Sequence, residues 1–235
     1  MAQVLIYKIF KEIKIMKNIK GFEDIMTIML PDMNDLENIK LPSIELYNNW
    51  MDFNERKIYL NFEIGPMLID IATKYILRWN KEDDDYKVEP NKRQPINIYI
   101  DSPGGSLQHC LSFIDILKMS KTPIKLICLS SALSAGALIF MCKGENITRL
   151  IVPHGSVLIH QGSINAGDSQ THAFLDVAES VKKNEAKVKE YVLANTTISK
   201  QLYTRNLKKE WWIDAEEAIQ LGIADKIITD ISELM

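Results

Sequence analysis

The sequence predicts an α/β fold with mostly parallel strands. Ile96, Ile98 and Ile100 alternate with polar residues as in a strand, and further short apolar runs span residues 124–129 and 157–159. A stretch with helical apolar spacing follows each of the first two runs. Because strands that alternate with helices are typical of parallel sheets, we expect a domain built from consecutive strand–helix units.

Length and charge narrow the possible classes of protein. A chain of 235 residues can bury a core without disulfides or metals, and we expect one domain with appendages. Its 28 basic and 31 acidic residues give a net charge of -3, which offers no global attraction for nucleic acid or an anionic membrane. We therefore expect no nucleic-acid partner.

The three cysteines, Cys110, Cys128 and Cys142, lie among apolar residues, which is typical of buried thiols in a reducing compartment. No ligand spacing indicates a metal site, and we expect no cofactor. The longest apolar runs are far shorter than the roughly 18 to 20 residues of a membrane span, and no signal-peptide pattern opens the chain. The expected location is the cytoplasm.

The expected division of the chain is an N-terminal arm or leader at residues 1–50 and a folded domain at residues 51–235. The first expected elements of the domain are a strand at residues 57–60 and a helix at residues 68–79. Residues 80–95 are rich in charge and are predicted to form a surface loop.

The second half of the domain continues the alternation. A stretch of small and polar residues at 162–169 leads to a long helix, whose apolar positions recur between residues 174 and 192. Asp214–Glu217 is a capping box that opens a last short helix, and Gly222 closes this helix. A final strand is expected at residues 226–229.

Three features with chemical potential come at the ends of predicted strands. Gly104-Gly105 and Ser134 each lie at a strand-to-helix turn, and His160 follows the third strand. Because these strand ends lie side by side in a parallel sheet, we expect a backbone amide, a hydroxyl and an imidazole to meet there. Acyl transfer requires these three groups.

Each feature also has an ordinary structural explanation. The small residues between Ser130 and Phe140 are also expected wherever two elements pack closely. A histidine after an apolar strand is commonly satisfied by a backbone partner, and Gly-Gly is a frequent turn. The combination of the three features favours the catalytic interpretation.

At these residues the chain resembles a known family. The segments Tyr99–Ser106, Ala132–Ala137 and Leu158–Gln161, in this order and at these separations, are similar to motifs of the proteolytic subunit of the Clp protease. The resemblance spans roughly residues 54–230 and includes the ending Ala215–Asp225. It implies a crotonase-like fold of stacked strand–helix units with a protruding long helix, and a Ser-His-Asp serine endopeptidase.

The resemblance assigns roles to residues of the motifs. It implies that Ser134 is the nucleophile, that His160 is the general base, and that the backbone amides of Gly105 and Ala135 form the oxyanion hole.

The third catalytic residue departs from the family pattern. An ungapped match places Glu210 where the family has its aspartate, and a glutamate can also orient an imidazole. Asp214 is a rival, although its predicted capping role explains it without catalysis.

The resemblance also implies two binding surfaces. The family docks ATPase loops in an apolar pocket, for which the matching positions are Asn97, Tyr99, Met119 and Ile228. Asn97 is polar where an aromatic residue is usual, so partner recognition is expected to differ.

The second surface is the segment that aligns the peptide substrate and joins two rings. Its matching residues are Gly162, Ser163 and Ile164, shifted by about one residue from the family pattern.

Three functions follow as hypotheses. The first is an endopeptidase that cleaves unfolded polypeptides inside a homo-oligomer of two stacked seven-membered rings, fed by a Clp-type ATPase. The second is a catalytically weak subunit that assembles with an active homologue, suggested by Glu210 and Asn97. The third is a crotonase-type acyl-CoA hydratase or isomerase, which would need neither Ser134 nor His160 and for which we find no signal of CoA binding.

Overall fold

The computed structural model describes residues 44–162 and 171–234. The internal contacts divide the chain into two units, residues 1–49 and residues 50–235. Most of the predicted N-terminal arm lies outside the described residues, of which the first helix is α3 (Ile44–Asn54). Among the helices of the described residues, none has the length and apolar character needed to cross a membrane.

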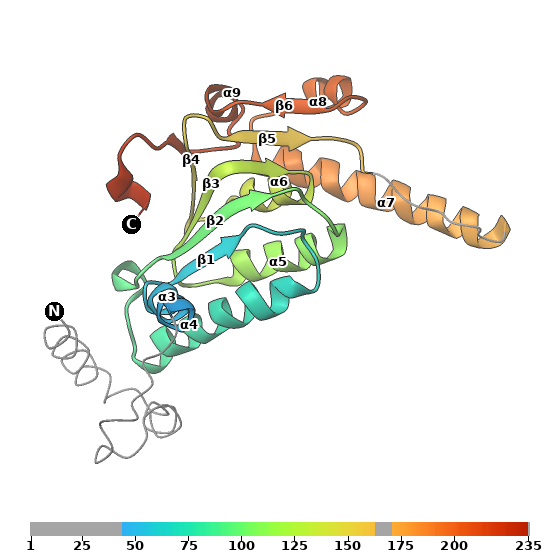
Figure 1. The fold of residues 1–235 in the computed structure, drawn as a ribbon. Coiled ribbons are helices and arrows are strands. Elements are labelled where there is room, and N and C mark those ends of the chain that lie inside the picture. The colour runs from blue at the N-terminus through green and yellow to red at the C-terminus, as the bar shows by residue number, and fades with distance from the viewer. Residues whose placement is uncertain (1–43, 163–170, 235) are drawn as a thin grey trace, which may run out of the picture. The chain divides into compact units, whose positions relative to one another are not determined.

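One sheet forms the centre of the second unit (Figure 1). In the described residues it has seven strands, five of them in the parallel order β1-β2-β3-β4-β7. The strands are β1 (Lys57–Leu60), β2 (Ile96–Ser102), β3 (Ile124–Leu133), β4 (Ile147–Ile151), β5 (Ser156–Ile159), β6 (Trp211–Ile213) and β7 (Lys226–Ile227). The predicted α/β fold with mostly parallel pairing is confirmed.

The long strand β3 pairs with β2 on one side and has two different neighbours on the other. Its first half, Ile124–Cys128, pairs with β4, whereas its last three residues, Ser131–Leu133, pair in parallel with β5. β5 in turn pairs with the antiparallel edge strand β6. The carboxyl ends of β3 and β5 therefore lie side by side in the sheet.

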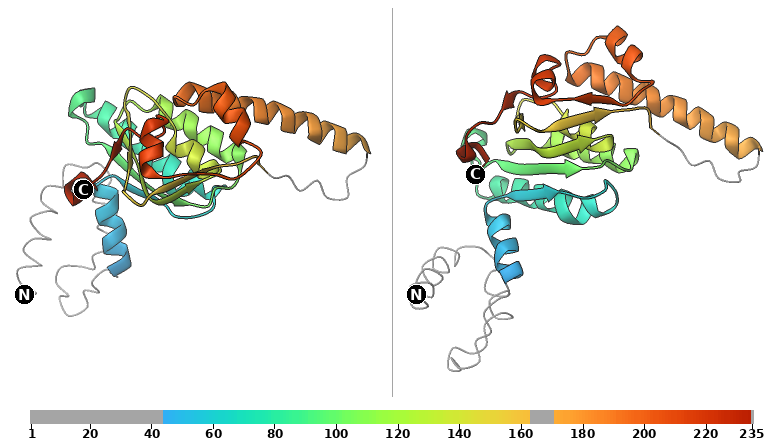
Figure 2. Two further views of the ribbon diagram at one scale, coloured as in Figure 1. Left: turned by 90° about the horizontal axis from the view of Figure 1, so that it is seen from above. Right: turned by 45° about the horizontal axis from the view of Figure 1, so that its top comes forward.

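Helices cover one face of this sheet (Figures 1 and 2). They are α4 (Lys74–Asp85), α5 (Leu107–Met119), α6 (Ala135–Phe140), α7 (Thr171–Asn195), α8 (Lys200–Asn206) and α9 (Ala215–Gln220). Because successive side chains of a strand point to opposite faces, Ile96, Ile98 and Ile100 of β2 pack in the large core under the helices. Tyr99 between them belongs to a second, smaller cluster.

The predicted long helix is present as α7, whose first half extends beyond the sheet in both views (Figure 2). Its other end is fixed to the sheet by Arg149 of β4, which is 3% exposed. The Arg149 guanidinium donates to the carbonyl oxygens of Asn195 and Gly222 at 3.0 and 2.7 Å and pairs with Asp225 at 2.6 Å. One buried cation thus joins the ends of α7 and α9 to β4.

The prediction of a surface loop over residues 80–95 is wrong for its first part, because α4 continues to Asp85. Asp83 is buried, and its carboxylate accepts two hydrogen bonds from Arg56 at 2.7 and 2.8 Å and one from the Thr122 hydroxyl at 2.7 Å. Burial alone would raise the pKa of the Asp83 carboxyl, but these donors outweigh it and lower the pKa. The charged segment is therefore part of the domain's structure.

We predict that Asp83→Asn lowers the free energy of unfolding by about 3 kcal/mol, because it leaves the Arg56 guanidinium without its buried counter-charge. Asp85→Asn is the matched control: the carboxylate of Asp85 forms an exposed pair with Lys81, and its loss should cost less than about 1 kcal/mol. Urea unfolding of the two variants measures both values, and equal stabilities would contradict the structural role of Asp83.

The same contact predicts a pH dependence. A carboxyl whose pKa is lowered in the folded state stabilises the protein above its unfolded pKa of about 3.9, and this stabilisation is lost as the pH falls through the folded value. The stability difference between wild type and Asp83→Asn should therefore be constant near neutral pH and shrink below about pH 4.

Candidate active site

Ser134 lies at the turn between β3 and α6. Its backbone has φ 53° and ψ −116°, a conformation that residues with side chains rarely adopt. The turn is fixed because the Ser134 amide donates to the carbonyl oxygen of Leu158 on β5 at 3.0 Å. Such strain is kept only where the surroundings impose it, and here it places the hydroxyl at the start of α6.

His160 follows directly after β5, whose end lies beside the end of β3. Its Nε2 atom is 2.8 Å from the Ser134 hydroxyl oxygen, which is hydrogen-bond distance. A neutral imidazole can accept the hydroxyl proton at this atom. The structure thus brings together two predicted site residues in the arrangement of a nucleophile and its base.

The turn Gly104-Gly105 packs against Ser134. A Cβ atom at Gly104 would lie 2.6 Å from the Ser134 Cβ, and one at Gly105 would lie 2.4 Å from the carbonyl oxygen of Ile64. Both glycines have positive φ, 96° and 140°. Only glycine allows this approach of the two backbones.

The two amides predicted to form the oxyanion hole belong to Gly105, in this turn, and to Ala135, the first residue of α6. Among the hydrogen bonds of the described residues, none uses either amide as donor. The amide of Ala135 has no partner within the helix because it lies in the first turn. Both N–H groups are therefore available to a developing oxyanion.

Two further residues support this site and were not among the predicted site residues. The Ser102 hydroxyl, which is buried, donates to the carbonyl oxygen of Phe62 at 2.7 Å and accepts from the Gly104 amide at 3.3 Å. The Cys110 thiol donates to the carbonyl oxygen of Ala135 at 3.2 Å. Ser102 could have been found from the sequence as a polar residue at the end of a buried strand. Nothing in the sequence distinguishes Cys110 from other core residues of a helix.

The Cys110 thiol remains protonated because burial raises its pKa to about 12. It can therefore serve as a hydrogen-bond donor and does not act as a thiolate nucleophile near neutral pH.

Glu210 directly precedes β6, the strand that pairs with β5. Among the described residues its side chain makes no hydrogen bond with His160. Trp211 of β6 pairs with Ile159 of β5, so Glu210 comes opposite His160 where the antiparallel ladder would continue. Its exposed side chain accepts a hydrogen bond from the Trp212 indole at 3.4 Å.

The rival residue Asp214 is the N-cap of α9. Its carboxylate accepts a hydrogen bond from the Glu217 amide at 2.8 Å, which confirms the predicted capping.

The residues predicted for binding surfaces are only partly brought together. Tyr99 and Ile228 lie in one apolar cluster with Ile127 and Leu150, against which Leu234 packs. Met119, at the end of α5, is 68% exposed and is not part of this cluster.

Asn97 lies two residues before Tyr99 on β2 and is buried, and its side-chain oxygen has no hydrogen-bond partner among the described residues. Of the predicted substrate-aligning segment, Gly162 is exposed, and Ser163 and Ile164 lie outside the described residues.

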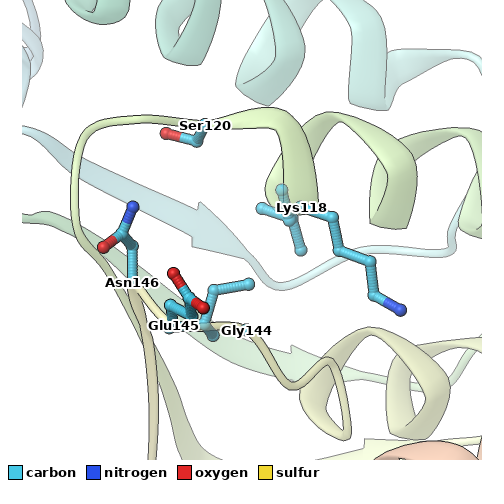
Figure 3. A pocket seen from close by; sticks show the side chains of 7 residues that line it. Lys118, Ser120, Gly144, Glu145 and Asn146 are labelled. Carbon is cyan, nitrogen blue, oxygen red and sulfur yellow. The ribbon is translucent and has the colours of Figure 1, made fainter.

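A pocket of about 210 Å³ lies elsewhere, between the end of α5 and the start of β4. Figure 3 shows Lys118, Ser120, Glu145 and Asn146 among its lining residues. None of the predicted site residues lines it.

Comparisons with known proteins agree with the predicted family. The family model described as Clp protease matches residues 51–231. The chain is 27% identical over 143 residues to the ATP-dependent Clp protease proteolytic subunit of Deinococcus radiodurans, covering 61% of this chain and 69% of that protein. It is also 27% identical over 199 residues to proteolytic subunit 1 of Chlamydia trachomatis, covering 83% of this chain and all of that protein.

The fold is similar to that of a solved structure, a ClpP1 mutant from Listeria monocytogenes, with a TM-score of 0.64 at 22% identity. The match covers 80% of this chain and 99% of the other. The arrangement of sheet and helices described above is therefore the Clp protease fold. With the family model matching residues 51–231, the chain belongs to the Clp protease family of peptidases.

Proposed function

We propose that the chain is a serine endopeptidase, the proteolytic subunit of a Clp-type protease that cleaves unfolded polypeptides. The observation that carries this proposal is the 2.8 Å contact between the Ser134 hydroxyl and His160 Nε2 at the adjoining ends of β3 and β5. Family membership supports the peptidase class. An acyl-CoA hydratase or isomerase would not need this contact for its reaction.

The proposed reaction begins when the Ser134 hydroxyl oxygen attacks the peptide carbonyl carbon and His160 Nε2 takes its proton. The amides of Gly105 and Ala135 donate to the oxyanion of the tetrahedral intermediate. The imidazolium then protonates the leaving amine, and an acyl-enzyme on Ser134 remains. His160 then deprotonates a water molecule that attacks this ester, and the imidazolium returns the proton to the Ser134 oxygen as its bond to the acyl group breaks. Glu210 keeps the imidazole oriented throughout.

The proposed assembly is a cytoplasmic homo-oligomer of two stacked seven-membered rings that receives its substrates from a Clp-type ATPase. Family membership supports this part of the proposal. The proposed site of ATPase contact is the surface at the predicted positions Asn97, Tyr99, Met119 and Ile228. Its accessible side chains are Met119, which is 68% exposed, and the half-exposed Tyr59, which stacks on Tyr99 with ring centroids 5.0 Å apart. Without the ATPase, we expect cleavage of short peptides only.

A second candidate function is a catalytically weak subunit that assembles with an active homologue. The observation that favours it is that Glu210 makes its hydrogen bond with Trp212 and not with His160 among the described residues. The two candidates differ in whether the purified chain itself reacts with a serine probe and turns over a peptide.

We predict that a fluorophosphonate probe labels Ser134, and that Ser134→Ala abolishes both labelling and cleavage of a fluorogenic peptide without disturbing assembly. Ser131→Ala is the matched control, because the Ser131 hydroxyl lies three residues earlier and is held by Asp101 at 2.9 Å. Labelling that survives in Ser134→Ala, or is lost in Ser131→Ala, would contradict the assignment of the nucleophile.

Gly104→Ala should lower peptide turnover by about 100-fold or more, because the added Cβ would displace Ser134 and a misplacement of about 1 Å can cost this much. Gly65→Ala provides the control, since its added Cβ would meet no atom closer than 3.8 Å. Peptide hydrolysis by both variants, with folding checked by circular dichroism, tests the close approach. Normal turnover in Gly104→Ala would show that the turn does not position the nucleophile.

Glu210→Gln is predicted to lower turnover by up to roughly 10⁴-fold, the loss known for the corresponding change in a serine-protease triad, whereas Glu210→Asp should be much milder. Asp214→Asn should retain activity, because asparagine also caps a helix. Steady-state hydrolysis by the three variants is the measurement. If Glu210→Gln is as active as wild type and Asp214→Asn is not, Asp214 is the third residue.

A further inference from the structure

The edge strand β6 carries two tryptophans with different surroundings. Trp211 and Ile213 are 7% and 1% exposed and belong to the large core. Because successive side chains of a strand alternate between faces, Trp212 points to the opposite face, where it is 53% exposed. Packing in the core explains Trp211 but not Trp212.

The partner strand β5 has the same alternation. Val157 and Ile159 belong to the core, so Leu158 and His160 are on the other face. The pairing of Leu158 with Trp212 in the antiparallel ladder places His160 and Trp212 on one face of the sheet. Glu210, two residues before Trp212, shares this face.

Directly opposite residues of antiparallel strands have Cβ atoms about 4.5 to 5.5 Å apart. If the ladder is continued by one step beyond Ile159 and Trp211, Glu210 comes opposite His160 at such a separation. A glutamate side chain can span this distance to an imidazole. The backbone therefore gives Glu210 the reach that its proposed role requires.

The Glu210 carboxylate has one hydrogen-bond donor among the described residues, the Trp212 indole N–H, at 3.4 Å from Oε2. Lys208 and Lys209 precede Glu210, but no ion pair in the described part of the chain includes this carboxylate. Its other oxygen, Oε1, thus retains its capacity to accept a hydrogen bond.

We propose that Trp212 is a positioning residue that restrains the Glu210 carboxylate beside His160. The indole holds Oε2, and Oε1 then accepts from the Nδ1–H group of the imidazole after a small side-chain rotation. This inference rests on the proposed function, in which Glu210 orients His160.

The restraint compensates for a physical difference between glutamate and aspartate. Glutamate has one more rotatable bond, so an exposed glutamate loses more conformational freedom when it is held against an imidazole. An indole N–H is a donor only and its ring is rigid, so it can fix one carboxylate oxygen without competing for a proton. An aspartate at position 210 has one rotatable bond fewer and would therefore depend less on this restraint.

The test removes the indole N–H while keeping the ring. Trp212 is replaced by β-(3-benzothienyl)alanine, in which sulfur stands in place of the N–H group, and separately by phenylalanine. We expect kcat for a fluorogenic peptide to fall about 3- to 10-fold in both variants with KM nearly unchanged, because the restraint acts on the base and not on substrate binding.

The matched background is Glu210→Asp. In this background the Trp212→Phe change should leave kcat within about twofold, since the shorter carboxylate does not depend on the indole. A role of Trp212 in folding or assembly alone would lower activity equally in both backgrounds. Sedimentation of every variant checks the oligomer.

Three results would overturn the proposal. Wild-type kcat in the benzothienylalanine variant would show that the hydrogen bond has no role, and an increase in kcat would show that the indole draws the carboxylate away from His160. An equal loss in both backgrounds would also contradict it. If Glu210→Gln is inactive in these cases, only the positioning role fails; if Glu210→Gln is fully active, the proposed triad fails as well.

Discussion

The pairing of the last three residues of β3 with β5 is the constraint on which the site depends. β3 and β5 are separated by β4 in sequence, and this pairing brings their ends side by side. The Ser134 amide extends the pairing by donating to the carbonyl oxygen of Leu158. Without this pairing, Ser134 and His160, 26 residues apart in the chain, would have no reason to meet. The strained turn at Ser134 is retained because both strands and α6 fix its ends.

The second requirement is the close approach of the Gly104-Gly105 turn to the same strand ends. Since both proposed oxyanion donors are backbone amides, their positions depend on packing of the turn against α6 and not on side-chain identity. Ser102 and Cys110 fix these two backbones from the buried side. The side chains that do the proposed chemistry are few, and the supporting residues are spread over β2, β3, β5 and the first turns of α5 and α6.

The sequence predicted β1, β2, β3, β5 and β7, the turns and the Ser134–His160 pair, because strand-end residues are set by local patterns and the parallel fold brings strand ends together. It did not indicate β4 or β6. It did not predict the burial of Asp83, since its partners Arg56 and Thr122 lie 27 and 39 residues away and only the fold joins them. Matching by sequence proposed Glu210 as the third residue, and in the structure Glu210 directly precedes β6, the strand that pairs with β5. It could not give the side-chain hydrogen bond of Glu210, whose carboxylate accepts from the Trp212 indole.

The central claim is that His160 activates Ser134, and the rate of fluorophosphonate labelling tests it most directly. His160→Ala should slow labelling of Ser134 by about 100-fold or more, because a serine hydroxyl without its base is a weak nucleophile near neutral pH. His109→Ala is the control, since His109 also contacts a serine hydroxyl, that of Ser106 at 2.9 Å, but at the start of α5. Labelling of His160→Ala at the wild-type rate would contradict the account.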